Sequence, residues 1–129
     1  MKQKTVYYAH AMCTYDSEIE RMDISTLNQM GFKVLNPNDP EIQEQYQLEK
    51  DIYLYYGMPM GFWRELAQSC DIFAFRSLPG GKIPSGVASE LTAARNAGMP
   101  IIELPPTGTD RFMTYQQTKD YFLECGYYK

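Results

Sequence analysis

The amino-acid sequence predicts one α/β domain, in which helices flank a doubly wound and mostly parallel sheet. Two observations lead to this fold. Short apolar runs at 71–75 and 100–104 are bounded by turn residues, which is typical of strands buried on both faces. The segments between such runs change to helical spacing, and glycine or proline closes several of them. Strands that alternate with helices through short loops favour a Rossmann-like or flavodoxin-like sheet, whose ligands bind beyond the carboxyl ends of the strands.

The beginning of the chain predicts a strand followed by a helix. Residues 5–10 are rich in β-forming side chains, and their early position favours the central strand of the sheet. Asp16 or Ser17 can cap the next helix, Glu20 completes a capping box with Ser17, and Gly31 ends the helix. We expect the apolar side of this helix to consist of Ile19, Met22, Leu27 and Met30.

The next segment predicts a second strand and two helices. The strand at 32–35 leads into the turn-rich stretch 36–40, whose polar groups either hold a sugar or satisfy the amides of the turn. Residues 41–56 have the spacing of a modestly amphipathic helix that carries several tyrosines. A further helix at 62–70 presents an apolar stripe to the sheet, and Trp63 is predicted to lie in the core or at an interface.

The stretch 71–90 organises the remainder of the chain. It combines a buried strand, a glycine-rich loop and the start of a helix, and Glu90 lies within about two turns of that start. Helix starts at the carboxyl edge of a parallel sheet are places where ligands bind. A last helix is predicted at 114–125, with Gly126 as its stop.

The bulk composition excludes several classes of protein. No apolar run approaches the roughly 18 residues that cross a bilayer, and the apolar run near the start is too short for a signal peptide, so we expect no membrane partner and a cytoplasmic location. The net charge of -4 argues against binding a nucleic-acid polymer. Three cysteines without paired spacing and one histidine predict neither a disulfide framework nor a metal site, and no cofactor is expected.

The residue types at the predicted carboxyl edge favour glycosidic chemistry. The sequence lacks a nucleophile elbow and a Walker phosphate loop, which leaves Glu90, a tyrosine able to bind it, and small residues that admit a ligand. Glu90 would attack the anomeric carbon of a nucleoside sugar, and Tyr7 would orient the carboxylate. Alternatively, Glu90 only stabilises the helix dipole, by about 0.3–1 kcal/mol. Residues expected to contact the substrate, a nucleoside or nucleotide, are Tyr8, His10, Asn36, Asp39, Arg76, Ser85, Gly86 and Val87.

Four stretches occur in order: KTVYYAHA at 4–11, CDIFAF at 70–75, SGVASELTAA at 85–94 and GMPII at 98–102. Together they resemble the nucleoside 2-deoxyribosyltransferase family, including its 2'-deoxynucleoside 5'-monophosphate N-hydrolase branch, over roughly residues 4 to 104. The resemblance implies that Tyr7 touches the catalytic carboxylate and that Glu90, in a Gly-x-x-x-Glu pattern, is the nucleophile. It also implies a homo-oligomer. The loop from Leu78 resembles, at longer spacing, the Pro-Gly-Gly loop of lysine-decarboxylase-like phosphoribohydrolases.

The sequence departs from the transferase pattern at two positions. Family members carry one acid that handles the base where this chain has Pro84, and a second acid, in the preceding helix, that falls near Trp63. Hydrolysis is therefore expected over base exchange. The proton donors that the sequence suggests are Asp39, Glu65 and His10, and it does not distinguish among them. The missing acids also allow an alternative, a non-catalytic module that senses or sequesters a nucleotide, and a purely structural subunit is a third reading.

Overall fold

The computed structural model describes residues 2–104 and 113–124. Their strands form one four-stranded sheet in the order β2-β1-β3-β4, and every pairing is parallel. The strands are β1 (Thr5–Ala9), β2 (Lys33–Leu35), β3 (Ile72–Arg76) and β4 (Ile101–Leu104). The prediction of a doubly wound α/β sheet is confirmed, and this strand order is that of the flavodoxin-like sheets.

Helices cover both faces of the sheet. A short 3-10 turn (Met12–Thr14) precedes α1 (Glu18–Gln29), and α2 (Pro40–Tyr55), α3 (Gly61–Gln68), α4 (Ser85–Asn96) and α5 (Tyr115–Glu124) follow. These bounds agree with the predicted helices to within two residues, and the 3-10 turn was not predicted. Cys125 and Gly126, the predicted end of the last helix, lie outside the described residues. No described helix is long and apolar enough to cross a membrane.

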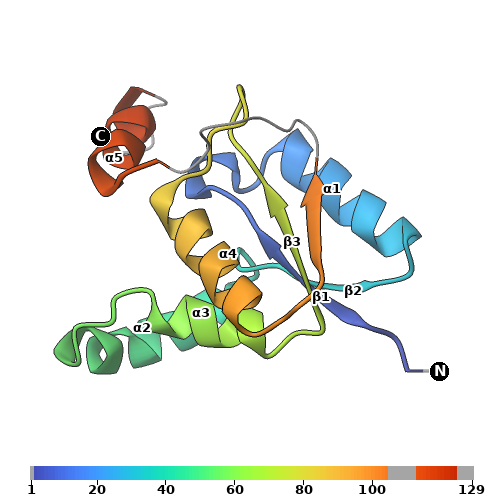
Figure 1. Ribbon diagram of the computed structural model, residues 1–129, viewed down its shortest axis with the longest axis horizontal. Coiled ribbons are helices and arrows are strands. Elements are labelled where there is room, and N and C mark those ends of the chain that lie inside the picture. Colours follow the sequence, from blue (N-terminus) through green and yellow to red (C-terminus); the bar gives the residue numbers. More distant parts are fainter. Residues whose placement is uncertain (1, 105–112, 125–129) are drawn as a thin grey trace.

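The two faces of the sheet carry separate cores, because successive side chains of a strand point in opposite directions. Val6 and Tyr8 of β1 pack with Leu27 of α1 on one face. Tyr7 and Ala9 pack with α3 and α4 on the other face. Figure 1 shows α1 on one side of the sheet and α3 and α4 on the opposite side.

The chain reverses its direction of winding between β1 and β3. From β1 it moves outward to β2, and it then crosses over to β3 and continues to β4. In open parallel sheets the crevice at such a reversal, at the carboxyl ends of the two strands, is the usual place for a ligand. The residues that follow β1 and β3 and the start of α4 meet at this edge, so this edge is where a site is expected.

The inward face of α1 differs from the prediction. Ser17 caps the helix by accepting a hydrogen bond from the Glu20 backbone amide, as expected. However, the side chains that α1 buries are two acids and one leucine, Glu20, Asp23 and Leu27. Ile19, Met22 and Met30, predicted to be on the apolar side, are exposed. The acids can turn inward because the sheet offers them His10, Tyr8 and Arg76 as partners.

Candidate active site

Glu90 and Tyr7 meet beneath the carboxyl edge of the sheet. Glu90 stands on the second turn of α4 and is 7% exposed, and Tyr7 rises from β1 and is fully buried. The Tyr7 hydroxyl donates a hydrogen bond to Glu90 Oε2. The ring of Tyr7 is held against Phe73 of the neighbouring strand, with ring centroids 5.8 Å apart. The register of the two central strands therefore fixes the tyrosine that contacts the carboxyl group.

Burial dominates the electrostatics of this pair. Desolvation raises the pKa of Glu90 from 4.5 to about 8, and the hydrogen bond from Tyr7 opposes this rise. The pKa of Tyr7 is raised well above 10, first by burial and then by the negative charge of Glu90. Tyr7 therefore remains a neutral hydrogen-bond donor. Glu90 holds a proton over much of the neutral range, and its ionised form has one strong donor to stabilise it.

A cavity of about 500 Å³ opens above Glu90. It is of the size that accommodates small ligands, and it lies at the sheet edge where the direction of winding reverses. Its walls are formed by the loop after β1 and by residues of α2, α3, α4 and α5 or of the turns that precede them. The lining residues include Ala11, Met12 and Tyr15 after β1, Gln43 and Tyr46 of α2, Pro59, Met60 and Trp63 around the start of α3, and Tyr115, Lys119 and Phe122 of α5.

The start of α4 forms one wall of the cavity. Ser85, Gly86 and Val87 line it, as the sequence predicted for substrate contacts. The Ser85 amide donates to Thr118 Oγ1 of α5 at 2.9 Å, which leaves the amides of Gly86 and Val87 as the other first-turn donors of α4 at this wall. Lys119, which follows Thr118, adds a positive charge to the same cavity. An anionic group is favoured here.

Aromatic rings form another wall, which was not among the substrate contacts predicted from the sequence. Trp63 of α3 and Tyr46 of α2 both line the cavity, and their ring centroids are 4.8 Å apart. The ring of Phe62 packs against both, with its centroid 4.9 Å from that of Trp63 and 5.4 Å from that of Tyr46. Trp63 was predicted to lie in the core or at an interface, and it is half-buried at the cavity. The i, i+3 spacing of Gln43 and Tyr46 was the sequence signal for a shared helix face.

His10 lines the cavity, but its ring nitrogens are engaged elsewhere. Nε2 lies 2.7 Å from Glu20 Oε2, and Nδ1 lies 3.1 Å from the Tyr8 carbonyl oxygen. The imidazole stacks on Tyr8 at 3.9 Å, and Tyr15 packs at 4.8 Å. Burial lowers the pKa of His10, while Glu20 acts in the opposite direction. This histidine is a fixed part of the wall, and its ring nitrogens do not face the cavity as proton donors.

Tyr8 and Arg76 lie on the face of the sheet opposite Glu90. The Tyr8 hydroxyl donates to Asp23 Oδ2 at 2.6 Å. Arg76 binds the same carboxylate through two nitrogens, at 2.8 Å and 2.5 Å. Because Tyr7 and Tyr8 are consecutive strand residues, they cannot reach the same site. Tyr8 and Arg76, which the sequence suggested as substrate contacts, instead hold α1 on the sheet.

The turn after β2 uses its polar groups internally. The Asn36 side chain accepts from the Asn38 amide at 3.0 Å, and Asn38 reaches Glu20 and Asp16. Asp39 is exposed and immediately precedes α2, where its side chain makes no capping hydrogen bond. Partial desolvation of its carboxyl group by burial, and then the negative charge of Glu20, raise the pKa of Asp39. Neither Asn36 nor Asp39 lines the cavity, so the structural interpretation of this turn fits better than sugar binding.

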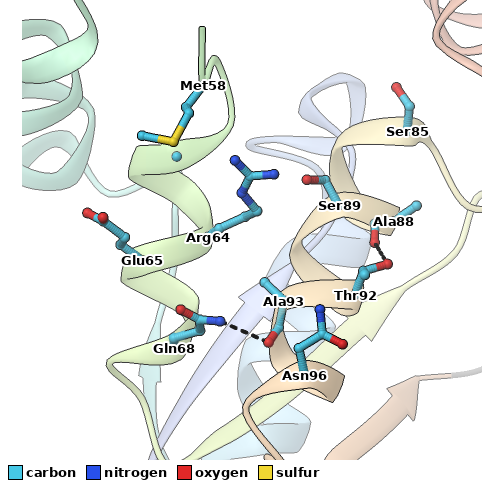
Figure 2. Close-up of a pocket in the computed structure, with 11 residues that line it drawn as sticks. Met58, Arg64, Glu65, Gln68, Ser85, Ala88, Ser89, Thr92, Ala93 and Asn96 are labelled. Carbon is cyan, nitrogen blue, oxygen red and sulfur yellow. Dashed lines mark hydrogen bonds between the residues drawn. The ribbon is translucent and has the colours of Figure 1, made fainter. Parts of the chain in front are cut away.

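A second groove of about 550 Å³ lies between α3 and α4 and does not contain Glu90. Figure 2 shows Arg64 extending from α3 into the gap, with Ser89 facing it from α4, while Gln68 donates to the Ala93 carbonyl oxygen. Glu65, one of the suggested proton donors, lines this groove and accepts a hydrogen bond from Tyr53. Glu65 therefore lies in this groove and not in the Glu90 cavity.

Comparison with known proteins gives no family to which the site can be assigned, so its function is inferred from its residues. No protein-family model matches the chain, and no curated protein matches it. Within the described residues, no group of three or more histidine, cysteine or acidic side chains is arranged to hold a metal ion. What the site offers is one buried carboxyl group with a tyrosine donor, the start of a helix, a lysine and an aromatic wall.

Proposed function

We propose that the protein is an N-glycosidase related to the nucleoside 2-deoxyribosyltransferases, which hydrolyses a nucleoside or nucleoside 5'-monophosphate through Glu90. The observation that carries the proposal is the Tyr7–Glu90 pair under a ligand-sized cavity at the reversal of the sheet. The resemblance implied the same pair from sequence alone. Moreover, Pro84, where the resembled family carries an acid that handles the base, and Trp63, near which its second acid falls, both line this cavity, which supports the assignment of the site.

In the proposed mechanism the ionised Glu90 attacks the anomeric carbon of the sugar. The C1'–N bond breaks, the base leaves with the electron pair, and a glycosyl ester with Glu90 forms. Water then attacks the same carbon, the ester C–O bond breaks, and the carboxylate is restored with release of one proton. The hydrogen bond from Tyr7 stabilises the carboxylate at the start and end of the cycle. The amides of Gly86 and Val87, together with Lys119, would hold a 5'-phosphate.

The leaving base needs a proton, and few groups of the cavity are able to donate one. Among the described residues, Glu90 is the only carboxyl group lining the cavity. Asp39 and Glu65 lie outside it, and the ring nitrogens of His10 are engaged. The departing base must then take its proton from water or from a lysine or tyrosine of the wall. This arrangement supports hydrolysis over base exchange, because exchange also needs a group that accepts the ring proton of an incoming base, and the one carboxyl group of the described cavity lining is already the nucleophile.

Base release from purified protein tests the proposal. A panel of ribo- and deoxynucleosides and their 5'-monophosphates is incubated with the wild type, and free base is separated by chromatography. We expect release that Glu90→Gln abolishes and that Glu65→Gln, a carboxyl change in the other groove, leaves intact. Release that survives Glu90→Gln contradicts the proposal. If Glu90 is the nucleophile, kcat/KM rises with pH toward about 8, where its carboxyl group ionises. A fall over that range would assign Glu90 an acid role instead.

A binding module on the same fold is the second candidate. It is favoured by the raised pKa of Glu90, because a carboxyl group that is protonated at neutral pH can donate a hydrogen bond but cannot attack. This candidate predicts saturable binding of an intact nucleotide, a thermal shift and no base release. Base release by the wild type excludes it.

We also propose that the chain forms a homo-oligomer, in which a second copy covers the outer side of α2. This helix buries none of its residues, and it and the turn after it expose Leu48, Ile52, Leu54, Tyr55 and Tyr56. An apolar surface of this kind fits the symmetric contact of two identical chains. Light scattering should give a mass of at least two chains, and a monomer at micromolar concentration contradicts this part of the proposal.

A further inference from the structure

We propose that Trp63 and Tyr46 form the platform on which the substrate base stacks. The site then selects a planar heteroaromatic base through stacking on these two rings and not through a hydrogen bond to an acidic side chain. This inference rests on the proposed function and names the group at the leaving end of its substrate. It gives Trp63, which lies near the position where the resembled family carries an acid, a role in binding the base.

The aromatic pair is held rigidly in a position suited to stacking. Trp63 and Tyr46 come from different helices, and Phe62 contacts both rings. Tyr53 adds an edge contact to Phe62 at 6.2 Å. The close approach of α2 and α3 depends on Gly61, where an added Cβ would lie 2.9 Å from Tyr53 Cε1. Both rings are half-buried and both line the cavity, so they present surface that the fold itself does not cover.

The cavity has a side that favours an anion and a side made of aromatic rings, and these two sides would orient a nucleotide along it. The start of α4 and Lys119 provide the side that favours an anion, and α5 is fastened to that start through Thr118. Figure 1 shows α5 at the start of α4, on the side away from α2 and α3. A 5'-phosphate at the start of α4 and an anomeric carbon at Glu90 would direct the base toward α2 and α3. Trp63 and Tyr46 line the cavity from those two helices.

One amide is available to distinguish the edges of different bases. Gln43 lines the cavity one turn before Tyr46, and its Nε2 donates to the Pro37 carbonyl oxygen at 2.7 Å. That bond fixes the orientation of the carboxamide, and within the described chain Gln43 Oε1 has no partner. An acceptor beside a stacking platform prefers a base edge that carries an amino donor. We therefore expect aminated bases, such as adenine and cytosine, to bind more tightly than their oxo counterparts.

The chain contains one tryptophan, which makes the test direct. Glu90→Gln protein, which cannot turn over, is titrated with 2'-deoxyadenosine 5'-monophosphate and separately with 2-deoxyribose 5-phosphate while tryptophan fluorescence is followed. We expect quenching by the nucleotide and none by the sugar phosphate, because only the base reaches Trp63. In calorimetric titrations Trp63→Leu and Tyr46→Leu should each weaken nucleotide binding about 10–100-fold, the range that base stacking supplies.

Matched variants separate stacking from general damage to the fold. Trp63→Phe keeps a ring and should retain most of the affinity, while Met22→Leu, a change at a 61% exposed side chain of α1 that does not line the cavity, should leave nucleotide affinity unchanged. Nucleotide binding without quenching, equal quenching by the sugar phosphate, or undiminished affinity in Trp63→Leu each overturns the proposal. The absence of nucleotide binding up to millimolar concentration overturns it as well. Quenching without base release by the wild type would instead refute only the catalytic proposal.

Discussion

Replacing Glu90 by glutamine should stabilise the fold at alkaline pH. Glutamine has the shape of the protonated acid, and its carbonyl oxygen still accepts the hydrogen bond of Tyr7. In the wild type the folded-state pKa of Glu90 lies above the ordinary value of 4.5, at about 8. The folded protein therefore holds this proton more tightly than the unfolded chain does. That contribution to stability is complete below about pH 4.5 and is lost as the pH rises through about 8.

The size of the effect follows from the interval between those two values. Each pH unit in that interval weakens the wild type by about 1.4 kcal/mol, which gives an upper limit of about 5 kcal/mol at pH 9. Water penetration and local rearrangement reduce the penalty of a buried charge, so we expect a measured difference of about 2–4 kcal/mol. At pH 4 the two proteins should unfold with nearly equal free energies. Glutamine should thus remove both the nucleophile and a source of alkaline instability.

Urea unfolding of both proteins from pH 4 to pH 9 measures this difference, and subtracting the two profiles cancels the titration of groups that they share. Glu44→Gln, the same carboxyl-to-amide change at an exposed position of α2, is the matched control. A flat difference for Glu90→Gln would mean that its carboxyl group titrates normally in the folded protein. That result would refute the assignment of Glu90 to a desolvated site.

Three further predictions concern the frame around the site. Asp23→Asn should cost about 3 kcal/mol in urea unfolding, because it leaves the half-buried Arg76 without its charge partner. Gly61→Ala should cost about 1–3 kcal/mol in the same assay, since the new methyl group overlaps the Tyr53 ring, and an unchanged free energy would contradict the described packing of α2 on α3. Cys70, whose pKa burial raises from 9.0 to about 11, should be alkylated about 100-fold more slowly at pH 8 in the native protein than in urea, as followed by mass spectrometry.

Most of the fold and the pair of residues at the centre of the site could be predicted from the sequence. Strand content, helical spacing and helix ends specify the elements, and the parallel sheet follows from their alternation. Tyr7 and Glu90 could be paired in advance because the early strand and the loop after β3 both end at the same edge of such a sheet. Ser17 was identifiable as a helix cap because the capping signal is local. These features depend on neighbours in sequence or on a simple rule of topology.

Features that depend on side-chain direction could not be predicted in the same way. Apolar spacing assigned Met22 and Met30 to the inner side of α1, but the fold buries Glu20 and Asp23 because partners on the sheet satisfy their charges. The strand alternation that places Tyr7 in the site also excludes Tyr8, a conclusion that the period of a strand already allowed. Trp63 had the spacing of a core residue, and only the position of α2 beside α3 shows that it faces a cavity.

Trapping the glycosyl ester on Glu90 tests the central claim most directly. The protein is mixed with a nucleoside 5'-monophosphate that it cleaves, quenched in acid within the first turnover, digested and examined by mass spectrometry. We predict a sugar phosphate attached to the peptide that contains Glu90, absent from Glu90→Gln. Rapid release of base with no adduct at any quench time, or an adduct on another residue, would contradict the claim that Glu90 is the nucleophile.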